Sequence, residues 1–386
     1  MAQKKHEETA TTEDEFKTTA DLINKEKGER VLRSLHEKRE SHTLEGGLSS
    51  GSISLDYAIN PRIGGMKWGQ LLQLYGKKSG GKSTIALGFA ANCTTVHKKH
   101  VLYLDLEGTV DEDMVFRSGV DHNFFTFVEE DGREAALILE RMMRAGDVGL
   151  VVIDSLAWWE PEVIAKKGSS AKDMVDFTQP KMAYQGSFVT QAIKKLCRTS
   201  RKTGTIVISI NQVRSNLDPY SGELSLVPYG PHALDHAISV QCLVKGKPRG
   251  KSAITNEDGE LIGQYTQIIV DKNKTAVPMK EAEVPLIFGV GVNPYMEIAT
   301  LAQQYGVVNG TAGNFKWAES GENIVRGTAN FVSRLANEPD LCDLITDKLI
   351  QVLGINYLAG KPVNAYQNPF VEDKNPHLKL LKNNEN

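Results

Sequence analysis

The segment from Gly76 to Ser83 has residue types that could bind a nucleoside triphosphate. It reads GKKSGGKS and fits the pattern G-x-x-x-x-G-K-[ST] without a mismatch, directly after the apolar run LLQLY and before STIALGFAANCTTV. Its glycines let backbone N–H groups surround the phosphates, Lys82 supplies a positive charge, and Ser83 offers a hydroxyl to Mg²⁺. A glycine-rich turn capped by Ser83 is the alternative, which the strand and helix patterns on either side disfavour. The predicted loop and its flank comprise Gly76, Lys77, Lys78, Ser79, Gly80, Gly81, Lys82, Ser83 and Thr84.

Two acidic residues at the ends of apolar runs could complete this site. LVVID ends at Asp154, and open α/β sheets bind ligands at the carboxyl ends of their strands, so Asp154 is predicted to orient Mg²⁺. An Asp-Ser helix cap is the alternative. VLYLDLE ends at Asp105 and Glu107, which strand alternation places on one side. If the two strands are neighbours, Glu107 lies near the γ-phosphate and could polarise water; otherwise it is a solvated acid.

These side chains need a sheet to position them. From Leu48 onward, short β-branched or Leu-rich runs alternate with helical spacing, which indicates an α/β fold with a mostly parallel twisted sheet flanked by helices. Later strand pairs predict antiparallel edge strands. Two segments, Lys166–Phe177 and Ser215–Pro231, fit neither pattern, as functional loops often do. The predicted strands are Leu71–Tyr75, Val101–Leu106, Phe125–Glu129, Gly149–Ile153, Thr205–Ile210, Ser239–Val244, Gln267–Val270 and Val284–Phe288.

Changes in composition divide the chain into four parts. Residues 1–44 are predicted to be an arm for subunit packing, with a short amphipathic helix from Asp21 onward. Residues 45–289 form the core, with irregular loops at about 160–185 and 213–231. Residues 290–356 are a small α+β domain, and residues 357–386, rich in Asn, Lys and Pro, form a loose tail. The small domain is predicted to have helices near Tyr295–Gln304, Gly327–Ala336 and Pro339–Leu353.

Composition excludes several classes of protein. Of 386 residues, 45 are Lys or Arg and 48 are Asp or Glu, so the net charge of −3 argues against a generally basic nucleic-acid coat but allows a local basic groove. The four cysteines lie far apart in the sequence and are expected to be reduced, buried thiols, not zinc ligands. No apolar leader or membrane span is found, so the expected location is the cytoplasm.

Ordered sequence blocks resemble the bacterial RecA family of homologous-recombination proteins. The likeness runs from about Leu48 to Leu353 through LSSGSISLDYAI, GGMKWGQLLQLYG, LYLDLEGTVD, VVIDS, SINQVR, DKNKTAVPMKEAEV and FGVGVNPYMEIATLAQQYGVV. The phosphate loop departs from the family at Lys77, Lys78 and Gly80, where a Pro-Glu pair and a Ser are usual. The phosphate-binding residues are kept.

The resemblance implies roles for individual residues. It implies ATP and Mg²⁺ bound by Lys82 and Ser83, Asp154 on the metal side and Glu107 as the catalytic carboxylate. Gln212 resembles the γ-phosphate sensor, whose amide could order a DNA-binding segment. The remaining implied nucleotide contacts are Asp111 and Phe288 at the adenine, and Lys272 and Lys274, which would reach a neighbouring subunit's ATP across a filament interface.

The two irregular segments correspond to the family's DNA-binding loops. Lysines and arginines there can neutralise phosphates while an apolar side chain wedges between bases, as expected of a protein that holds a single strand without reading its sequence. The implied DNA-binding residues are Lys166, Lys167, Lys172, Thr190, Lys194, Arg214, Leu217, Tyr220 and Gly230.

The resemblance implies an ATP-dependent recombinase that forms helical filaments on single-stranded DNA. It would catalyse homologous pairing with duplex DNA and strand exchange, with DNA-stimulated ATP hydrolysis. A RecA-fold helicase motor is one alternative, although helicases lack the DKNK block as arranged here. An accessory filament that binds DNA under ATP control without strand exchange is another. This alternative is supported by departures from the family at the second loop and the subunit interface, which are Pro231, His232, Asp235 and His236.

Overall fold

The computed structural model describes residues 2–28, 32, 46–161, 181–217, 224–228, 234–246, 248–256, 258–311 and 313–357. These divide into two compact units, residues 1–45 and residues 46–386. In the first unit, α1 spans Ala2–Lys27 and is longer than the short helix predicted from Asp21 onward. The correction has a physical reason, because half of the residues before Asp21 are Ala, Lys or Glu, which are strong helix formers even without an apolar stripe.

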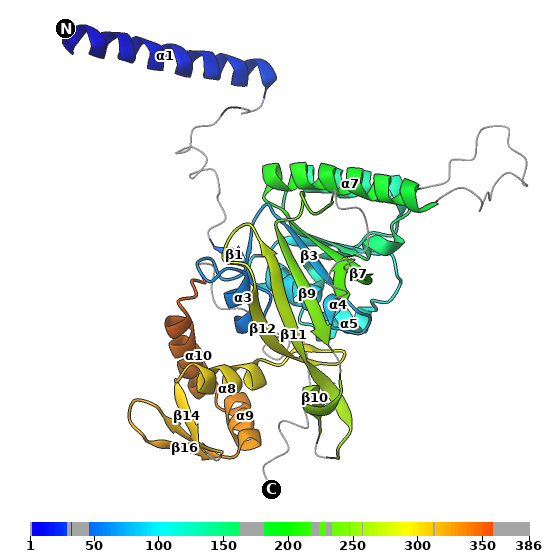
Figure 1. Cartoon of the computed structure of the whole chain (residues 1–386), viewed down its shortest axis with the longest axis vertical. Helices are drawn as coiled ribbons and strands as arrows, with labels where there is room; N and C mark the ends of the chain where they lie inside the picture. Colours follow the sequence, from blue (N-terminus) through cyan, green and yellow to red (C-terminus); the bar gives the residue numbers. More distant parts are fainter. Residues whose placement is uncertain are drawn as a thin grey trace, which may run out of the picture. The chain divides into compact units, whose positions relative to one another are not determined.

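One large sheet organises the second unit, as Figure 1 shows. Its hydrogen-bonded order within the described residues is β13-β12-β11-β9-β3-β7-β6-β4-β5, with β10 beside β11 and β8 beside β7. Neighbours from β9 to β5 are parallel, whereas β11, β12 and β13 add antiparallel strands at one edge. The predicted fold class is therefore confirmed. The strands are β3 (Leu71–Gly76), β4 (His100–Asp105), β5 (Phe125–Phe127), β6 (Val148–Asp154), β7 (Ile206–Leu217), β8 (Leu224–Pro228), β9 (Val240–Gly246), β10 (Ala253–Thr255), β11 (Leu261–Asn273), β12 (Lys280–Ile287) and β13 (Gly291–Val292).

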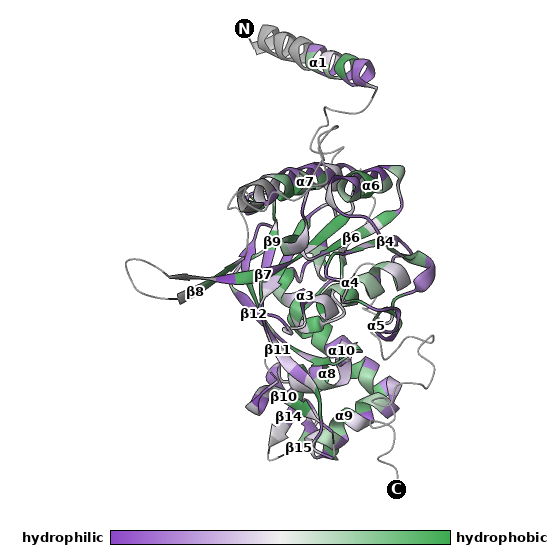
Figure 2. Ribbon diagram, turned by 90° about the vertical axis from the view of Figure 1, so that its right-hand side faces the viewer, coloured by the Kyte–Doolittle hydropathy of each residue, from purple (hydrophilic) through white to green (hydrophobic). Residues whose placement is uncertain are grey.

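Helices cover both faces of the parallel strands (Figure 2). On one face, Leu139 of α6 (Gly132–Ala145) and Ile193 of α7 (Lys181–Thr203) pack against Leu104, Val151 and Val207 of the sheet. The residues between these in the strands, such as Val152 and Ile208, face the other way and are fully buried toward α4 (Lys82–Thr95). The strands are thus buried on both sides, which explains their continuous apolar runs.

The second irregular segment is partly regular, which corrects the prediction. β7 continues to Leu217 and pairs antiparallel with β8, with Val213 opposite Pro228 and Arg214 opposite Val227. Figure 2 shows this hairpin extending from the sheet. Residues 213–217 and 224–228 contain no Gly and only Pro228 at one end, so they can pair as strands with side chains on alternating faces. The Gly and Pro residues nearby nevertheless suggest a loop.

Residues 290–357 have a separate hydrophobic cluster. α8 (Pro294–Gln304), α9 (Thr328–Asn337) and α10 (Pro339–Leu353) pack with the antiparallel strands β14 (Val308–Thr311), β15 (Asn314–Trp317) and β16 (Asn323–Arg326). The rings of Phe315 and Phe331 stack at 4.6 Å between centroids. Ile53 of α3 (Ile53–Ile59) joins this cluster and ties it to the core. All three predicted C-terminal helices are confirmed.

A buried carboxylate holds the end of the described chain against the core. Asp56 of α3 is fully buried and accepts hydrogen bonds from Ser50 N at 2.8 Å, from the hydroxyls of Ser49 and Ser50, and from Tyr357 Oη at 2.9 Å. Asn356 N also donates to Pro61 O at 2.8 Å. Desolvation raises the pKa of Asp56 from 3.8 to about 7, although all these donors favour the charged form.

Asp56 should therefore make stability fall as pH rises. Because the folded state binds this proton more tightly than the unfolded chain, the stabilising contribution is complete below pH 4 and is lost as pH passes through 7. We expect the unfolding free energy of the native protein, relative to Asp56→Asn, to fall by about 2 kcal/mol between pH 5 and 7. Urea unfolding at both pH values measures this. Parallel pH dependence of the two proteins would show that Asp56 does not titrate in this range.

Among the described residues, no helix is long and apolar enough to cross a membrane. Cys93, Cys197, Cys242 and Cys342 are all buried, as predicted. The small strands β1 (Gly47–Leu48) and β2 (Met66–Lys67) pair beside the core.

Candidate nucleotide site and nucleic-acid interface

The predicted nucleotide residues lie where parallel strands end together. β3 leads into the phosphate loop at Gly76, and Gly76 pairs with Gln212 of the neighbouring β7. Next to β7, β6 ends at Asp154, which pairs with Asp105 at the end of β4. Glu107 is expected to lie near the γ-phosphate if its strand is the neighbour of the strand that carries Asp154, and the two strands are neighbours. β4 itself ends at Asp105, so strand alternation does not extend to Glu107.

The phosphate loop leaves the first N–H groups of α4 without a side-chain cap. α4 starts at Lys82, and its N-cap residue Gly81 has a φ of +96°. Ser79 also has a positive φ of +58°, so the loop turns back on itself. Lys82 Nζ donates to Gly76 O at 3.2 Å and to Lys77 O at 2.8 Å, which places its charge inside the loop. Burial lowers the pKa of Lys82, and the carboxylates of Asp154 and Glu107 oppose this shift.

Gly81 offers a sharp test of the loop. A Cβ there would lie 2.3 Å from Leu286 Cδ1, at a φ that side chains rarely adopt. We expect Gly81→Ala to weaken nucleotide binding at least about tenfold, because its φ of +96° lies outside the left-handed region open to side chains and the buried Leu286 must also move, which together shift the loop. Gly108→Ala is the matched control, since Gly108 also has a positive φ (+63°) but a Cβ added there would face open space, with no neighbouring atom within 4 Å. Calorimetric titration with an ATP analogue compares them; equal affinities would contradict the steric argument.

The predicted metal-side residues are in direct contact. Ser83 Oγ donates to Asp154 Oδ2 at 2.7 Å, and Tyr103 Oη donates to the same oxygen at 2.9 Å. Burial raises the pKa of Asp154, while these two hydroxyls oppose the shift. Hydroxyl and carboxylate oxygens are the ligands Mg²⁺ prefers, and it usually takes only one or two protein ligands beside phosphates and water. Among the described residues no cluster of three His, Cys, Asp or Glu side chains could hold a metal ion.

Glu107 is held by Ser155, the residue that follows β6, and by Gln212 of β7. Ser155 Oγ donates to Glu107 Oε1 at 2.6 Å, and Gln212 Nε2 donates to the same oxygen at 3.3 Å. Gln212 thereby connects the carboxylate to β7, the strand that continues into the β7–β8 hairpin. This contact is the most informative one in the site, because it joins the residue that could activate water to the segment expected to bind DNA.

The residues predicted at the adenine are separated in sequence but lie on adjoining elements. Asp111 is exposed and caps α5 (Glu112–Arg117), accepting from Met114 N at 2.6 Å. Phe288 follows β12 and is 43% exposed, so one ring face could stack on a base. A Cβ on the next residue, Gly289, would lie 4.0 Å from the guanidinium of Arg117 on α5.

The two predicted interface lysines lie together but away from their own phosphate loop. Lys272 Nζ donates to the carbonyl of Asp235, and Lys274 Nζ donates to His236 O at 2.8 Å. Residues 235 and 236 precede β9, whose start lies beside Leu72, whereas its far end at Val244 lies beside Gly76. Lys272 lies opposite Gln241, which in turn lies opposite Gln73, so the lysine is two strands across and three residues back along the sheet from the loop glycine Gly76. Desolvation and then the charge of Lys274 lower the pKa of Lys272.

The predicted DNA-binding residues are only partly within the described chain. Arg214 is exposed on β7, and Leu217 is the last residue of that strand. Thr190 donates to Gly186 O at 2.7 Å on α7, where Lys194 is exposed. Lys166, Lys167, Lys172, Tyr220 and Gly230 lie outside the described residues, as do Pro231 and His232.

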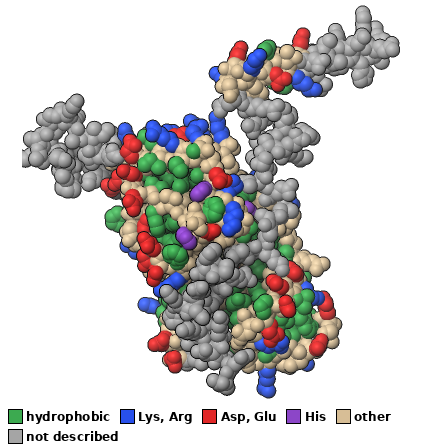
Figure 3. All heavy atoms as spheres, turned by 180° about the vertical axis from the view of Figure 1, so that it is seen from behind, with side chains coloured by type: hydrophobic (Ala, Val, Ile, Leu, Met, Phe, Trp, Pro, Cys, Tyr) green, Lys and Arg blue, Asp and Glu red, His purple; other side chains and the backbone are tan. Residues whose placement is uncertain are grey.

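The exposed side of α7 is basic. In Figure 3, blue side chains gather along the upper edge of the core. From residue 185 onward, the exposed cations of α7 are Lys194, Lys195, Arg198, Arg201 and Lys202, of which Lys195 is paired with Glu140 of α6 at 2.5 Å. Such a local concentration is what a protein with a net charge of −3 would need to attract a phosphate backbone.

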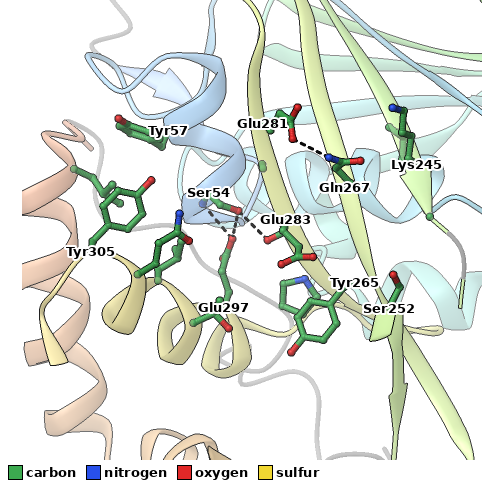
Figure 4. A pocket seen from close by; sticks show the side chains of 18 of the residues that line it. Ser54, Tyr57, Lys245, Ser252, Tyr265, Gln267, Glu281, Glu283, Glu297 and Tyr305 are labelled. Carbon is green, nitrogen blue, oxygen red and sulfur yellow. Dashed lines mark hydrogen bonds between the residues drawn. The ribbon is translucent and has the colours of Figure 1, made fainter. Parts of the chain in front are cut away.

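A cavity of about 690 Å³ lies beside the phosphate loop, whose Lys77 lines it together with residues of β9, β11, β12, α3 and α8. Figure 4 shows the side chains of Glu281, Glu283 and Glu297 lining it. Glu297 is tied to Ser52 and Ser54 by hydrogen bonds of 2.5 and 2.6 Å. The lining thus combines three acidic side chains with Lys77 and Lys245, so the glycine loop fits the phosphates better than this cavity does.

Sequence reasoning missed three side chains at the loop. Tyr103 reaches Asp154 from within an otherwise aliphatic strand. From β11, Gln264 Nε2 donates to Ser79 O at 3.2 Å and Thr266 Oγ1 donates to Gly80 O at 3.4 Å. The sequence does mark these residues as unusual, because Tyr103 stands in a buried strand and Gln264 and Thr266 are polar residues at alternating positions of another. Only the sheet order shows that they contact the site.

This fold and loop define the class of phosphate-loop nucleotide-binding proteins. A family model described as "RecA N-terminal domain" matches residues 14–293. "Protein RecA" of Macrococcus caseolyticus is 31% identical over 332 residues, covering 85% of this chain and 88% of the relative. "Protein RecA" of Streptococcus uberis is 31% identical over 334 residues, covering 86% and 84%, and that of Mannheimia haemolytica is 29% identical over 307 residues, covering 79% and 78%. The chain belongs to the RecA family.

Proposed function

We propose that the protein is an ATP-dependent recombinase that assembles on single-stranded DNA and pairs it with homologous duplex DNA. The observation that carries the proposal is the contact of Glu107 with Gln212, because it links a carboxylate at the nucleotide site to the strand of the β7–β8 hairpin. Family membership and the basic face of α7 support the assignment of DNA as partner.

In the proposed reaction, Glu107 orients water for attack on the γ-phosphate of ATP. The loop N–H groups and Lys82 bind the phosphates, and Gly81 allows the backbone to approach them closely. Ser83 and Asp154 would hold Mg²⁺, which when bound neutralises charge on the β- and γ-phosphates. Asp111 and Phe288 would contact the adenine.

The γ-phosphate could act as a switch through Gln212. In the structure, the side-chain amide of Gln212 donates to Glu107. A terminal phosphate would offer that amide a stronger, charged acceptor. Moving the amide from Glu107 to the phosphate would free the carboxylate for water and shift the start of the hairpin. ATP would thus favour the DNA-gripping conformation, and hydrolysis would release it.

Lys272 and Lys274 would act on the nucleotide of a neighbouring subunit. They lie two strands away from β3 and its loop, and their ammonium groups are held by the carbonyls of residues 235 and 236, so we assign to them a phosphate presented by another molecule. A head-to-tail contact of this kind generates filaments when it does not close into a ring. Residues 1–44 are proposed to pack between subunits.

The experiment is joint-molecule formation between circular single strands and homologous linear duplex, with ATP and Mg²⁺. We expect homology-dependent joint molecules with the native protein and none with Lys82→Ala. Filament binding without joint molecules would point to the accessory filament, and unwinding of a forked duplex without homology would point to the helicase motor. Either result would overturn the proposal of strand exchange.

A further inference from the structure

Two polar side chains of β3 point toward the lysine pair. Tyr75, the residue before the loop glycine Gly76, donates its hydroxyl to Asp271 Oδ2 of β11 in a short hydrogen bond. Gln73, two residues earlier, accepts from Gln241 Nε2 at 3.0 Å, and the same amide donates to Asp235 Oδ1 at 3.1 Å. Gln73 and Gln241 are both buried. β3 is therefore connected to Lys272 by two routes. Tyr75 bonds to Asp271, the residue before Lys272. Gln73 is linked through Gln241 to Asp235, whose carbonyl accepts a hydrogen bond from Lys272.

A β-bulge sets the direction of these contacts. In the β9–β11 pairing, Ile269 lies opposite Leu243 and Lys272 opposite Gln241, so Val270 and Asp271 share a single partner position at Cys242. A bulge bends the strand and re-aims its side chains. Here Asp271 meets Tyr75 while Lys272 extends to the carbonyl of Asp235.

The charges around Asp271 favour this arrangement. Burial raises the pKa of Asp271, whereas the Tyr75 hydroxyl, the backbone N–H groups of Asp271 and Lys272, and the charge of Lys272 oppose the shift. Within the described residues, Asp271 Oδ1 is buried without a hydrogen-bond partner, so the Tyr75 hydroxyl is the side-chain contact that holds this carboxylate. Fixing it restricts where Lys272 can point.

We propose that Tyr75 and Asp271 are positioning residues that hold Lys272 in place for the neighbouring subunit's nucleotide. Because Tyr75 adjoins the phosphate loop of its own subunit, the pair joins one nucleotide site to the lysines that serve the next. The proposal rests on the proposed function, in which the lysines act between subunits. The Tyr75–Asp271 contact adds a physical connection between the nucleotide sites of neighbouring subunits, and such a connection is required if the two sites are to be coupled.

Tyr75→Phe tests the proposal, because it removes only the hydroxyl. We expect DNA-stimulated kcat to fall roughly tenfold, as for loss of a hydrogen bond to a charged group, with little change in KM for ATP. General damage to β3 would instead weaken binding at the adjacent loop and raise KM. Tyr265→Phe, a half-buried tyrosine of β11 at the other end of that strand, is the matched control and should leave both constants unchanged.

A mixture of two defective variants shows which subunit carries the effect. Lys82→Ala subunits lack a working loop but keep the lysines, whereas Lys272→Ala/Lys274→Ala subunits keep the loop. If a mixture hydrolyses ATP, adding Tyr75→Phe to the Lys82→Ala partner should lower the rate roughly tenfold, and adding it to the lysine variant should not. An equal effect in both partners, or none, overturns the positioning role. A mixture that fails even with Tyr75 intact contradicts the proposed function instead.

Discussion

Replacing both interface lysines, Lys272→Ala/Lys274→Ala, is expected to lower DNA-stimulated ATP hydrolysis by about 10²–10³-fold. The two ammonium groups lie side by side, held by the carbonyls of residues 235 and 236, and can stabilise charge that develops on a phosphate presented by another subunit. Binding of ATP to the variant's own loop should be unchanged, because the lysines lie two strands away from that loop and are held by the carbonyls of residues 235 and 236. Steady-state hydrolysis with single-stranded DNA and equilibrium nucleotide binding measure the two effects separately.

The control for this experiment is Lys67→Ala/Lys316→Ala. Both lysines are exposed and lie on other small strands, β2 and β15, so their loss changes the net charge equally. The control should hydrolyse ATP at the native rate. Equal losses in the two double variants would mean that charge alone, and not the position of the lysines, supports the reaction.

Glu107→Gln is expected to bind ATP and DNA but to hydrolyse ATP about 10²–10⁴-fold more slowly. The amide still accepts the hydrogen bonds of Ser155 and Gln212, so the local structure should persist, but it cannot act as a base. DNA complexes formed with ATP should therefore dissociate more slowly than those of the native protein. Single-turnover hydrolysis and filter-binding dissociation rates measure both effects.

Glu129→Gln is the matched control for the carboxylate. Glu129 is exposed and lies two residues after the end of β5, as Glu107 lies two residues after the end of β4. Its replacement should leave hydrolysis unchanged. Native activity in Glu107→Gln would require another residue to activate water and would remove Glu107 from the proposed reaction.

The nucleotide site follows closely from the sequence because its signals are local. A glycine loop between an apolar strand and a helix has few other uses, and an acid at the end of a buried strand is placed by the sheet itself. What the sequence leaves open is strand order. Whether Glu107 reaches the loop depends on β4 lying beside β6, a pairing between residues about fifty positions apart that no local pattern encodes.

The sequence is less informative where a residue's meaning depends on distant contacts. The i, i+2 spacing of Lys272 and Lys274 suggests a shared side, but a β-bulge and the carbonyls before β9 decide where they point. The β7–β8 hairpin escapes prediction because its Gly and Pro residues suggest a loop, while its pairing is formed across the turn. The length of α1 escapes prediction because the helix has no apolar stripe to mark it.

The most direct test of the central claim is the mixture of Lys82→Ala with Lys272→Ala/Lys274→Ala on single-stranded DNA. If ATP is hydrolysed between subunits, a random equal mixture places an intact loop against intact lysines at about a quarter of the interfaces. We therefore predict that two variants that are inactive alone regain about a quarter of the native ATP hydrolysis when mixed. Activity no greater than the sum of the separate variants would contradict a nucleotide site shared between subunits.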